Sequence, residues 1–293
     1  IGPELEKRIQ IVIDTGLVEL KNDSRIYWNN ATIGKLIPGK DYLSPNIELL
    51  VDDMLEQNQK SKLTNFLEKW LKNKISLVLK SLYDLKDLKD KNSSIKALAY
   101  QLYENNGVLK RDMVSEYLKK LEQNDRKILR DLGVKFGRYH VYLFKLIKPE
   151  PVSLRTLLWK NHNQKYFNLK PPTFGLNFLN GDKIQNKNFM LLCGFEKFNN
   201  FYIRIDILER LFVQIINSNT KDMKEIKMVP EMLNLLGCKK DDFKQLLRAM
   251  SYKILEKDNE VFFKYNPKKR VKLQNKENVK ENPFGVLKNL NLN

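Results

Sequence analysis

The order of elements predicted for the C-terminal third constrains the fold more than any other feature of this sequence. Val229–Leu236 has the length and apolar spacing of a short helix, Gly237 supplies a turn, and Asp241–Met250 predicts a second helix. Lys253–Tyr265 then predicts a hairpin that turns at Asp258-Asn259. Helix, glycine turn, helix and hairpin in this order are typical of a winged helix-turn-helix.

A second hairpin is predicted near the N-terminus. Arg25–Trp28 and Ala31–Ile37 are rich in strand-forming residues, and Asn29-Asn30 between them tolerates the positive φ of a tight turn. These strands define a small β-hairpin unit over residues 1–43. Ser44-Pro45 then predicts the start of a helix, with serine as N-cap and proline at the first helical position. The apolar face of that helix contains Ile47, Leu50, Val51, Met54 and Leu55.

Helical periodicity dominates residues 44–165, which we expect to form a helical accessory domain built as a bundle or array. Apolar residues recur every three or four positions in a long helix from about Ser61. Three further helices are predicted at Ser93–Tyr103, Asp112–Leu121 and Asp125–Leu132, because each opens with a residue that can cap it. Ser153–Trp159 returns to helical spacing.

Residues 166–188 are predicted to form a linker, since this part of the chain is rich in Asn, Lys, Pro and Gly. Strands are then predicted at Phe189–Gly194 and Phe201–Ile205, followed by a helix at Ile207–Asn217. With the winged-helix elements they define a domain over residues 189–265. The basic, polar residues 266–293 are expected to be disordered. The predicted fold class is mainly α (α+β).

The charge balance favours a polyanionic partner. The 293 residues include 53 Lys and Arg against 35 Asp and Glu, which gives a formal net charge of +18. Nucleic acid is the commonest polyanion for such a chain. The alternative is compositional bias, since AT-rich coding also enriches Lys, Asn and Ile. No apolar run has the length of a membrane span, so we expect a soluble, cytoplasmic protein that does not enter membranes.

No catalytic or metal-binding constellation is recognisable. Cys193 and Cys238 form no Cys-x-x-Cys pair and are expected to be small buried side chains. His140 and His162 lack partners at metal-ligand spacing. Gly34–Lys40 has the GxxxxGK spacing of a P-loop, but an aspartate follows where Ser or Thr should reach magnesium. We therefore predict no catalytic residue, metal site or cofactor in this chain.

Two groups of basic and aromatic residues are candidates for contacts with nucleic acid. The first lies between Gly133 and Pro149, where charged side chains are set among large apolar ones. The second lies on and before the second helix of the winged unit. The candidates, cations for phosphates and tyrosines for base stacking, are Arg138, Tyr139, Tyr142, Lys145, Lys239, Lys240, Lys244 and Arg248. The alternative for both groups is structural, as packing within a helical domain or protein contact by a winged helix.

One apolar group interrupts the basic C-terminal segment. In Asn282–Leu290, helical spacing would place Phe284, Leu287 and Leu290 on one face. We expect this face to dock onto a partner or onto the body of the protein. A disordered end with a few apolar residues is the alternative.

Several blocks follow one another in a characteristic order along nearly the whole chain. The central one is the most specific, with LGVKFG at 132–137, LxKPE at 146–150 and LLW at 157–159. The flanking blocks are 26–36 with 39–45 and 49–53, 99–102 with 106–109, 203–210 and 230–238. In this order they resemble the C-terminal region of bacterial superfamily-2 ATP-dependent helicases related to the mitochondrial degradosome RNA helicase.

The resemblance implies a helicase whose two RecA-like motor domains, with ATP and Mg, lie on the N-terminal side. This chain has no acceptable Walker A motif, no DExD or DExH box and no arginine-rich motor motif, so no catalytic residue is carried over. It begins with Ile1 rather than Met, and we expect a fragment. The expected function is the accessory, nucleic-acid-binding part of an RNA or DNA helicase, with single-stranded nucleic acid and the upstream motor as partners. The alternative is a protein-interaction scaffold that docks a motor or a nuclease.

Overall fold

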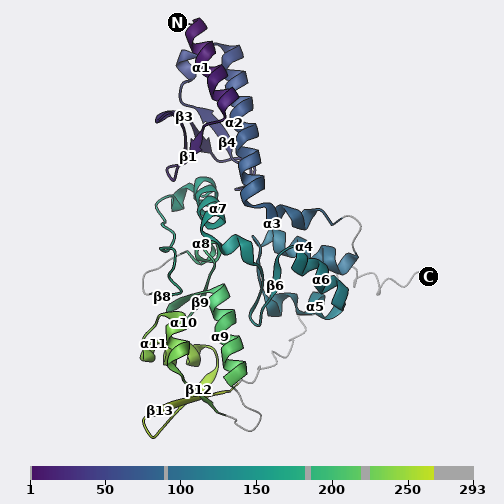
Figure 1. Ribbon diagram of the computed structural model, residues 1–293, viewed down its shortest axis with the longest axis vertical. Helices are drawn as coiled ribbons and strands as arrows, with labels where there is room; N and C mark the ends of the chain where they lie inside the picture. Colours follow the sequence, from purple (N-terminus) through teal and green to yellow (C-terminus); the bar gives the residue numbers. More distant parts are fainter. Residues whose placement is uncertain (1, 89–91, 182–185, 219–224, 267–293) are drawn as a thin grey trace, which may run out of the picture.

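The computed structural model describes residues 2–88, 92–181, 186–218 and 225–266. Figure 1 shows an N-terminal lobe at the top, a middle lobe at the right and a C-terminal lobe at the bottom. Helices and four small antiparallel sheets make this an α+β protein, and the coarse class predicted from the sequence is therefore confirmed. Within the described ranges, no helix is both long enough and apolar enough to cross a membrane.

The N-terminal lobe is a four-stranded antiparallel sheet with two helices. Its strands, in spatial order, are β1 (Glu19–Leu20), β2 (Arg25–Trp28), β3 (Ala31–Ile37) and β4 (Asn46–Leu49). The predicted hairpin is confirmed, since Asn29 and Asn30 join β2 to β3 with φ angles of 44° and 65°. α1 (Gly2–Thr15) packs against α2 (Gln57–Val78).

The helix predicted from Ser44-Pro45 is wrong. The residues after it form β4, which pairs with β3, and a 3-10 turn, η1 (Asp52–Met54), follows. Ile47 is buried and pairs with Leu36, whereas its two neighbours on β4 are exposed. This alternation has the period of a strand, and the apolar run is too short for periodicity alone to separate strand from helix. The N-terminal sheet therefore extends past residue 43, the boundary expected from the sequence.

Gly39 lies in the loop between β3 and β4, where the fold leaves no space for a side chain. A Cβ at this position would overlap the backbone carbonyl oxygen of Ser44. We expect Gly39→Ala to lower the free energy of unfolding by about 1–3 kcal/mol, the range for overpacking. Urea denaturation followed by circular dichroism measures this change. Lys40→Ala, at the exposed next position, should cost less than about 0.5 kcal/mol, and equal effects of the two would contradict the steric explanation.

α2 is the long helix that runs from the N-terminal lobe to the middle lobe (Figure 1). It begins before Ser61, the predicted start, because the side chain of Gln59 accepts a hydrogen bond from the backbone N–H of Glu56 at 3.1 Å and closes the first turn. One residue in every four is buried along its inner face. These apolar residues are Leu63, Leu67, Leu71 and Ile75.

The middle lobe combines short helices with a sheet that the sequence did not predict. Its helices are α3 (Lys80–Tyr83), η2 (Asp84–Lys86), α4 (Ser93–Glu104), η3 (Arg111–Val114), α5 (Ser115–Lys120) and α6 (Gln123–Asp131). The three helices predicted here are thus present, although the second begins as the 3-10 turn η3. The sheet has the order β5 (Val108–Lys110), β7 (His140–Leu143) and β6 (Val134–Phe136). Its strands are too short to show a recognisable alternation in the sequence. β5 pairs with β7, which is distant in the sequence, so no local pattern predicts this pairing.

A central helix, α7 (Pro149–His162), contacts α2 and β3 of the N-terminal lobe and confirms the helical spacing predicted for Ser153–Trp159. The 3-10 turns η4 (Phe144–Ile147) and η5 (Gln164–Tyr166) flank it. Arg155 on α7 is fully buried, and its guanidinium donates hydrogen bonds to backbone carbonyls of three other segments. The packing of α7 therefore depends on polar as well as apolar contacts.

The strand predicted at Phe189–Gly194 is wrong. This segment belongs to α8 (Lys187–Leu192), whose first turn is capped by the side chain of Asn186. Its contiguous apolar residues are buried, a pattern that fits a buried helix as well as a buried strand. The adjacent sheet has the order β8 (Phe178–Asn180), β10 (Phe201–Arg204) and β9 (Phe195–Phe198). Part of the segment expected to be a linker thus pairs in a sheet.

The C-terminal lobe contains the elements predicted first from the sequence. These are α10 (Pro230–Leu236), α11 (Lys240–Ala249), β12 (Tyr252–Lys257) and β13 (Glu260–Tyr265), preceded by α9 (Ile205–Ser218) and by β11 (Ile226–Lys227), a strand that the sequence did not predict. Gly237 ends α10 with a φ of 69°, and Asp258 and Asn259 turn the hairpin with φ angles of 48° and 63°. The sheet order is β11-β13-β12. The tail predicted to be disordered, with Phe284, Leu287 and Leu290, lies outside the described residues.

Candidate functional site

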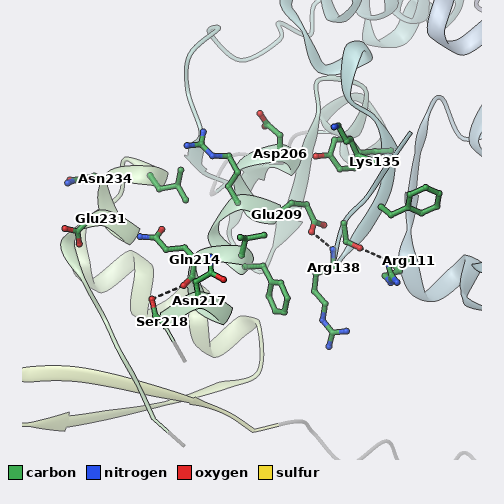
Figure 2. A pocket seen from close by; sticks show the side chains of 17 residues that line it. Arg111, Lys135, Arg138, Asp206, Glu209, Gln214, Asn217, Ser218, Glu231 and Asn234 are labelled. Carbon is green, nitrogen blue, oxygen red and sulfur yellow. Dashed lines mark hydrogen bonds between the residues drawn. The ribbon is translucent and has the colours of Figure 1, made fainter. Parts of the chain in front are cut away.

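An open groove of about 1220 Å³ runs along α9, between the middle and C-terminal lobes. Figure 2 shows Arg111, Lys135 and Arg138 on one side of the α9 residues, and Glu231 and Asn234 of α10 on the other. The wall from the middle lobe is β6 and the turn that leads into β7, the glycine-bracketed segment singled out in the sequence. The groove is therefore built from segments about 70 residues apart in the chain.

Three cations of this groove have exposed side chains without an ion-pair partner among the residues that the structure describes. Lys135 lies on β6, Arg138 lies in the turn that follows, and Arg210 lies on α9. Arg111 also lines the groove, but its guanidinium donates a hydrogen bond of 2.7 Å to the carbonyl of Gly137 and braces the turn. Lys135, Arg138 and Arg210 are therefore the groove cations available to a ligand.

The acidic residues of the groove are mostly occupied by partners. Asp206 accepts two hydrogen bonds from the guanidinium of Arg204, at 2.6 and 3.0 Å. The carboxylate of Glu209 accepts three backbone N–H groups, and only Glu231 is an exposed acid. The groove consequently offers a ligand an excess of positive charge.

Two half-buried aromatic rings line the groove beside arginines. The guanidinium carbons of Arg126 and Arg130 each lie 5.6 Å from the ring centroid of Phe136, and that of Arg138 lies 5.4 Å from the centroid of Phe212. Both rings and guanidinium planes are surfaces on which nucleobases stack. The groove thus places stacking surfaces next to cations.

One carboxylate holds the turn that forms the middle-lobe wall. Glu209 accepts hydrogen bonds from the backbone N–H groups of Arg138, Tyr139 at 2.8 Å and His140 at 2.9 Å. A Cβ at Gly137 would overlap this carboxylate, so only glycine allows the close approach. The turn is therefore fixed to α9 rather than to its own sheet alone.

His140 is buried between two carboxylates. Its Nε2 lies 2.9 Å from Glu196 and its Nδ1 lies 3.6 Å from Glu209, while Lys110 approaches Glu196 at 3.3 Å. Burial lowers the pKa of His140, but the two carboxylates outweigh it and raise the pKa above its ordinary value. Burial raises the pKa of Glu196, but the hydrogen bonds and the charges of His140 and Lys110 together outweigh this, and the net shift is downward. The ring of His140 on β7 therefore lies between carboxylates of β9 and α9.

The structure separates the residues predicted as nucleic-acid contacts. Arg138 lies in the groove, whereas Tyr139 is half-buried and packs edge-on against Phe198 and Phe212. Tyr142 is only 5% exposed, so its ring offers no free face for stacking, contrary to the exposure expected from the sequence. Lys145 is exposed on η4, outside the residues that line the groove.

The basic residues predicted on α11 form a separate surface. Lys239, Lys240 and Arg248 are exposed, and none of them lines the groove. Lys244 is only partly exposed, and its ammonium pairs with Glu256 at 2.6 Å. This pair removes Lys244 from the set of candidate cations, which leaves Lys240 and Arg248 on α11 and Lys239 just before it.

Sequence reasoning did not identify Lys135, Arg210 or Glu209 as site residues. A single charged residue on a predicted helix or strand does not reveal from the sequence which groove its side chain will line. The one available signal was Gly137, whose missing side chain makes room for Glu209. Among the residues that the structure describes, no three His, Cys, Asp or Glu side chains are grouped so as to hold a metal ion.

Comparison with known proteins leaves the groove as the main evidence on function. No protein-family model, curated protein or solved structure matches this chain. A functional assignment must therefore depend on the charge, shape and chemistry of the groove, together with the order of motifs in the sequence.

Proposed function

We propose that this chain is a nucleic-acid-binding accessory region that holds a single strand of RNA or DNA in the groove along α9. The observation that carries the proposal is one open groove that Lys135, Arg138 and Arg210, none of them in an ion pair with a described residue, line together with Phe136 and Phe212. Cations that track a phosphate backbone and aromatic rings that accept bases are the two components of single-strand binding.

A second surface supports contact with the same strand or with an adjoining duplex. The order α9, β11, α10, α11, β12 and β13 supports assignment of the C-terminal lobe as a winged helix. In that assignment α11 presents Lys239, Lys240 and Arg248 to phosphates. Asp241 and Asp242 at the start of α11 act against this contact, because they place negative charge nearest the anion.

The order of motifs leads to a more specific proposal about the full-length protein. It supports the accessory region of an ATP-dependent superfamily-2 helicase in the cytoplasm, with the motor domains, ATP and Mg upstream of this chain. In such a protein the groove would keep hold of the strand while the motor moves along it. The catalytic work would belong to the motor rather than to this chain.

A protein-interaction scaffold is the second candidate function. Val213 and Ile216 on α9 are 56% and 53% exposed, and Val213 lines the groove. Exposed apolar side chains beside cations also fit an acidic, amphipathic segment of a partner, such as the motor or a nuclease. The two functions differ in the occupant of the groove: a nucleic-acid strand in the first, and a segment of a partner protein in the second.

Fluorescence anisotropy tests the proposed function directly. Labelled single-stranded RNA and DNA of about 12 nucleotides, and the corresponding duplex, are titrated with the chain across a salt series. Three phosphate contacts predict a slope of log K against log salt of about −2, because each contact with a single strand contributes about −0.7. An absence of binding at the lowest salt, from a folded chain, would overturn the proposal and favour the scaffold.

A further inference from the structure

Two side chains from other elements hold the turn that carries Arg138: Arg111 donates to the carbonyl of Gly137, and Glu209 accepts from the N–H groups that follow it. Three consecutive N–H groups, of Arg138, Tyr139 and His140, point at the carboxylate of Glu209 (Figure 2 shows the first of these bonds). Hydrogen bonds to an ionised acceptor are about twice as strong as neutral ones. The direction in which Arg138 leaves the turn is therefore set by α9, on the other side of the groove.

The carboxylate of Glu209 is in turn adjacent to a buried imidazole. His140 faces Glu209 from α9 and Glu196 from β9, and Lys110 on β5 shares Glu196. Lys187 and Lys197 line a small cavity of about 180 Å³ next to His140. With a proton on both nitrogens, the ring lies as a cation between the two carboxylates. As a neutral ring it would leave one of these buried carboxylates facing an unprotonated nitrogen.

We propose that Glu209 and His140 are positioning residues of the groove, which clamp the 137–140 turn onto α9 and hold Arg138 toward a bound strand. This inference rests on the proposed function and adds a regulation to it. Neither residue needs to touch the nucleic acid: Glu209 acts through the backbone of the turn, and His140 acts through Glu209.

The pH dependence of the clamp follows from the charge on His140. The pKa of His140 in the folded protein is above the ordinary value of about 6.5, so the clamp is complete below that pH. The contribution of His140 to the clamp is lost as the pH rises through the folded pKa, because the neutral ring no longer balances two carboxylates. Affinity for a single strand should therefore fall as the pH rises through the folded pKa of His140, a group that titrates apart from phosphates and arginines.

Removal of one negative charge from the groove distinguishes positioning from simple electrostatics. Glu209→Gln and Glu231→Gln each remove one carboxylate that lines the groove. Electrostatics alone predicts tighter binding of single-stranded RNA by both variants. Positioning predicts that Glu209→Gln weakens binding by about threefold or more, as the turn is released, while Glu231→Gln binds at least as tightly as the unmodified chain. Tighter binding by Glu209→Gln would overturn the proposal.

A double variant shows whether Glu209 acts through Arg138. In the Arg138→Gln background the proposed contact between Arg138 and the strand is already lost. Glu209→Gln should therefore cause little further loss of affinity. An undiminished loss in that background would indicate general damage to the fold and would overturn the positioning role. Circular dichroism of each variant shows whether the helical content is retained.

The pH profile supplies a readout that a merely structural role would not change. The affinity of the unmodified chain should fall with rising pH, and His140→Gln should abolish this fall. His162→Gln is the control, since His162 is the other histidine of the chain and lies outside the residues that line the groove. A pH dependence that persists in His140→Gln would overturn the proposed regulation.

The clamp is also measurable without nucleic acid, which separates its failure from failure of the proposed function. Glu209→Gln should accelerate hydrogen exchange of the amides of residues 138–140 by about tenfold or more, and Glu231→Gln should not. Accelerated exchange in a chain that binds no nucleic acid would confirm the clamp and reject the binding function. Unchanged exchange would reject the clamp itself.

Discussion

Replacing Arg155 by methionine is expected to lower the free energy of unfolding by about 3 kcal/mol or more. Arg155 has no exposed surface, and its guanidinium donates to the carbonyls of Asn106 at 2.8 Å, Leu146 at 2.6 Å and Leu192 at 2.9 Å. Methionine fills much of the same volume but donates no hydrogen bond. Three carbonyls lose a donor, those of Leu146 and Leu192 in buried positions, and each buried unsatisfied group costs about 1–3 kcal/mol.

One effect works in the opposite direction. Removing the guanidinium also removes the cost of keeping a charge away from water, and no carboxylate offsets that cost through an ion pair among the residues that the structure describes. We expect the loss of three hydrogen bonds to outweigh this gain, because each buried orphaned carbonyl costs about 1–3 kcal/mol. Lysine should restore little stability, since a single ammonium does not reproduce the planar fork of donors.

Urea denaturation followed by circular dichroism measures the loss. Arg8→Met is the control, because Arg8 is an exposed arginine on α1 and its change should cost less than about 0.5 kcal/mol. A loss at Arg155 no larger than that at Arg8, with the same dependence on urea, would contradict the proposed role of the three hydrogen bonds.

Changing the three free cations of the groove to glutamine is expected to weaken single-strand binding by at least about tenfold at low salt. Lys135, Arg138 and Arg210 are exposed, so their replacement should leave the fold intact. Each lost phosphate contact removes about 0.7 from the salt slope, and the slope of the triple variant should therefore be less negative by about 2. Anisotropy titrations at several salt concentrations measure both quantities.

Two variants of equal charge serve as comparisons. Lys239, Lys240 and Arg248 changed to glutamine test the surface predicted from the sequence, and Lys7, Lys69 and Lys72 changed to glutamine control for net charge. We expect the largest loss from the groove variant and the smallest from the N-terminal control. Equal losses from all three variants would show that binding follows the overall charge. A loss confined to the variant of Lys239, Lys240 and Arg248 would place the strand on α11.

Much of the local structure was predictable from short segments. Asn29-Asn30 and Asp258-Asn259 turn their hairpins with the positive φ that asparagine and aspartate tolerate, and Gly237 ends α10 in the same region. α2 is evident because its apolar residues recur over many turns. Where a segment was short and apolar, as in β4 and α8, the same reasoning failed. Its length left strand and helix equally compatible with the pattern.

The sequence by itself determined the turns, the long amphipathic helices, the order of elements in the C-terminal lobe and the excess of positive charge. Only the tertiary structure decided which charges act together. Arg138 and Arg210 share a groove because Glu209 reaches across about 70 residues of sequence to the backbone of the turn. Lys244, predicted to be free, is instead paired with Glu256. Such pairings depend on the packing of distant segments, which no local pattern of residues specifies.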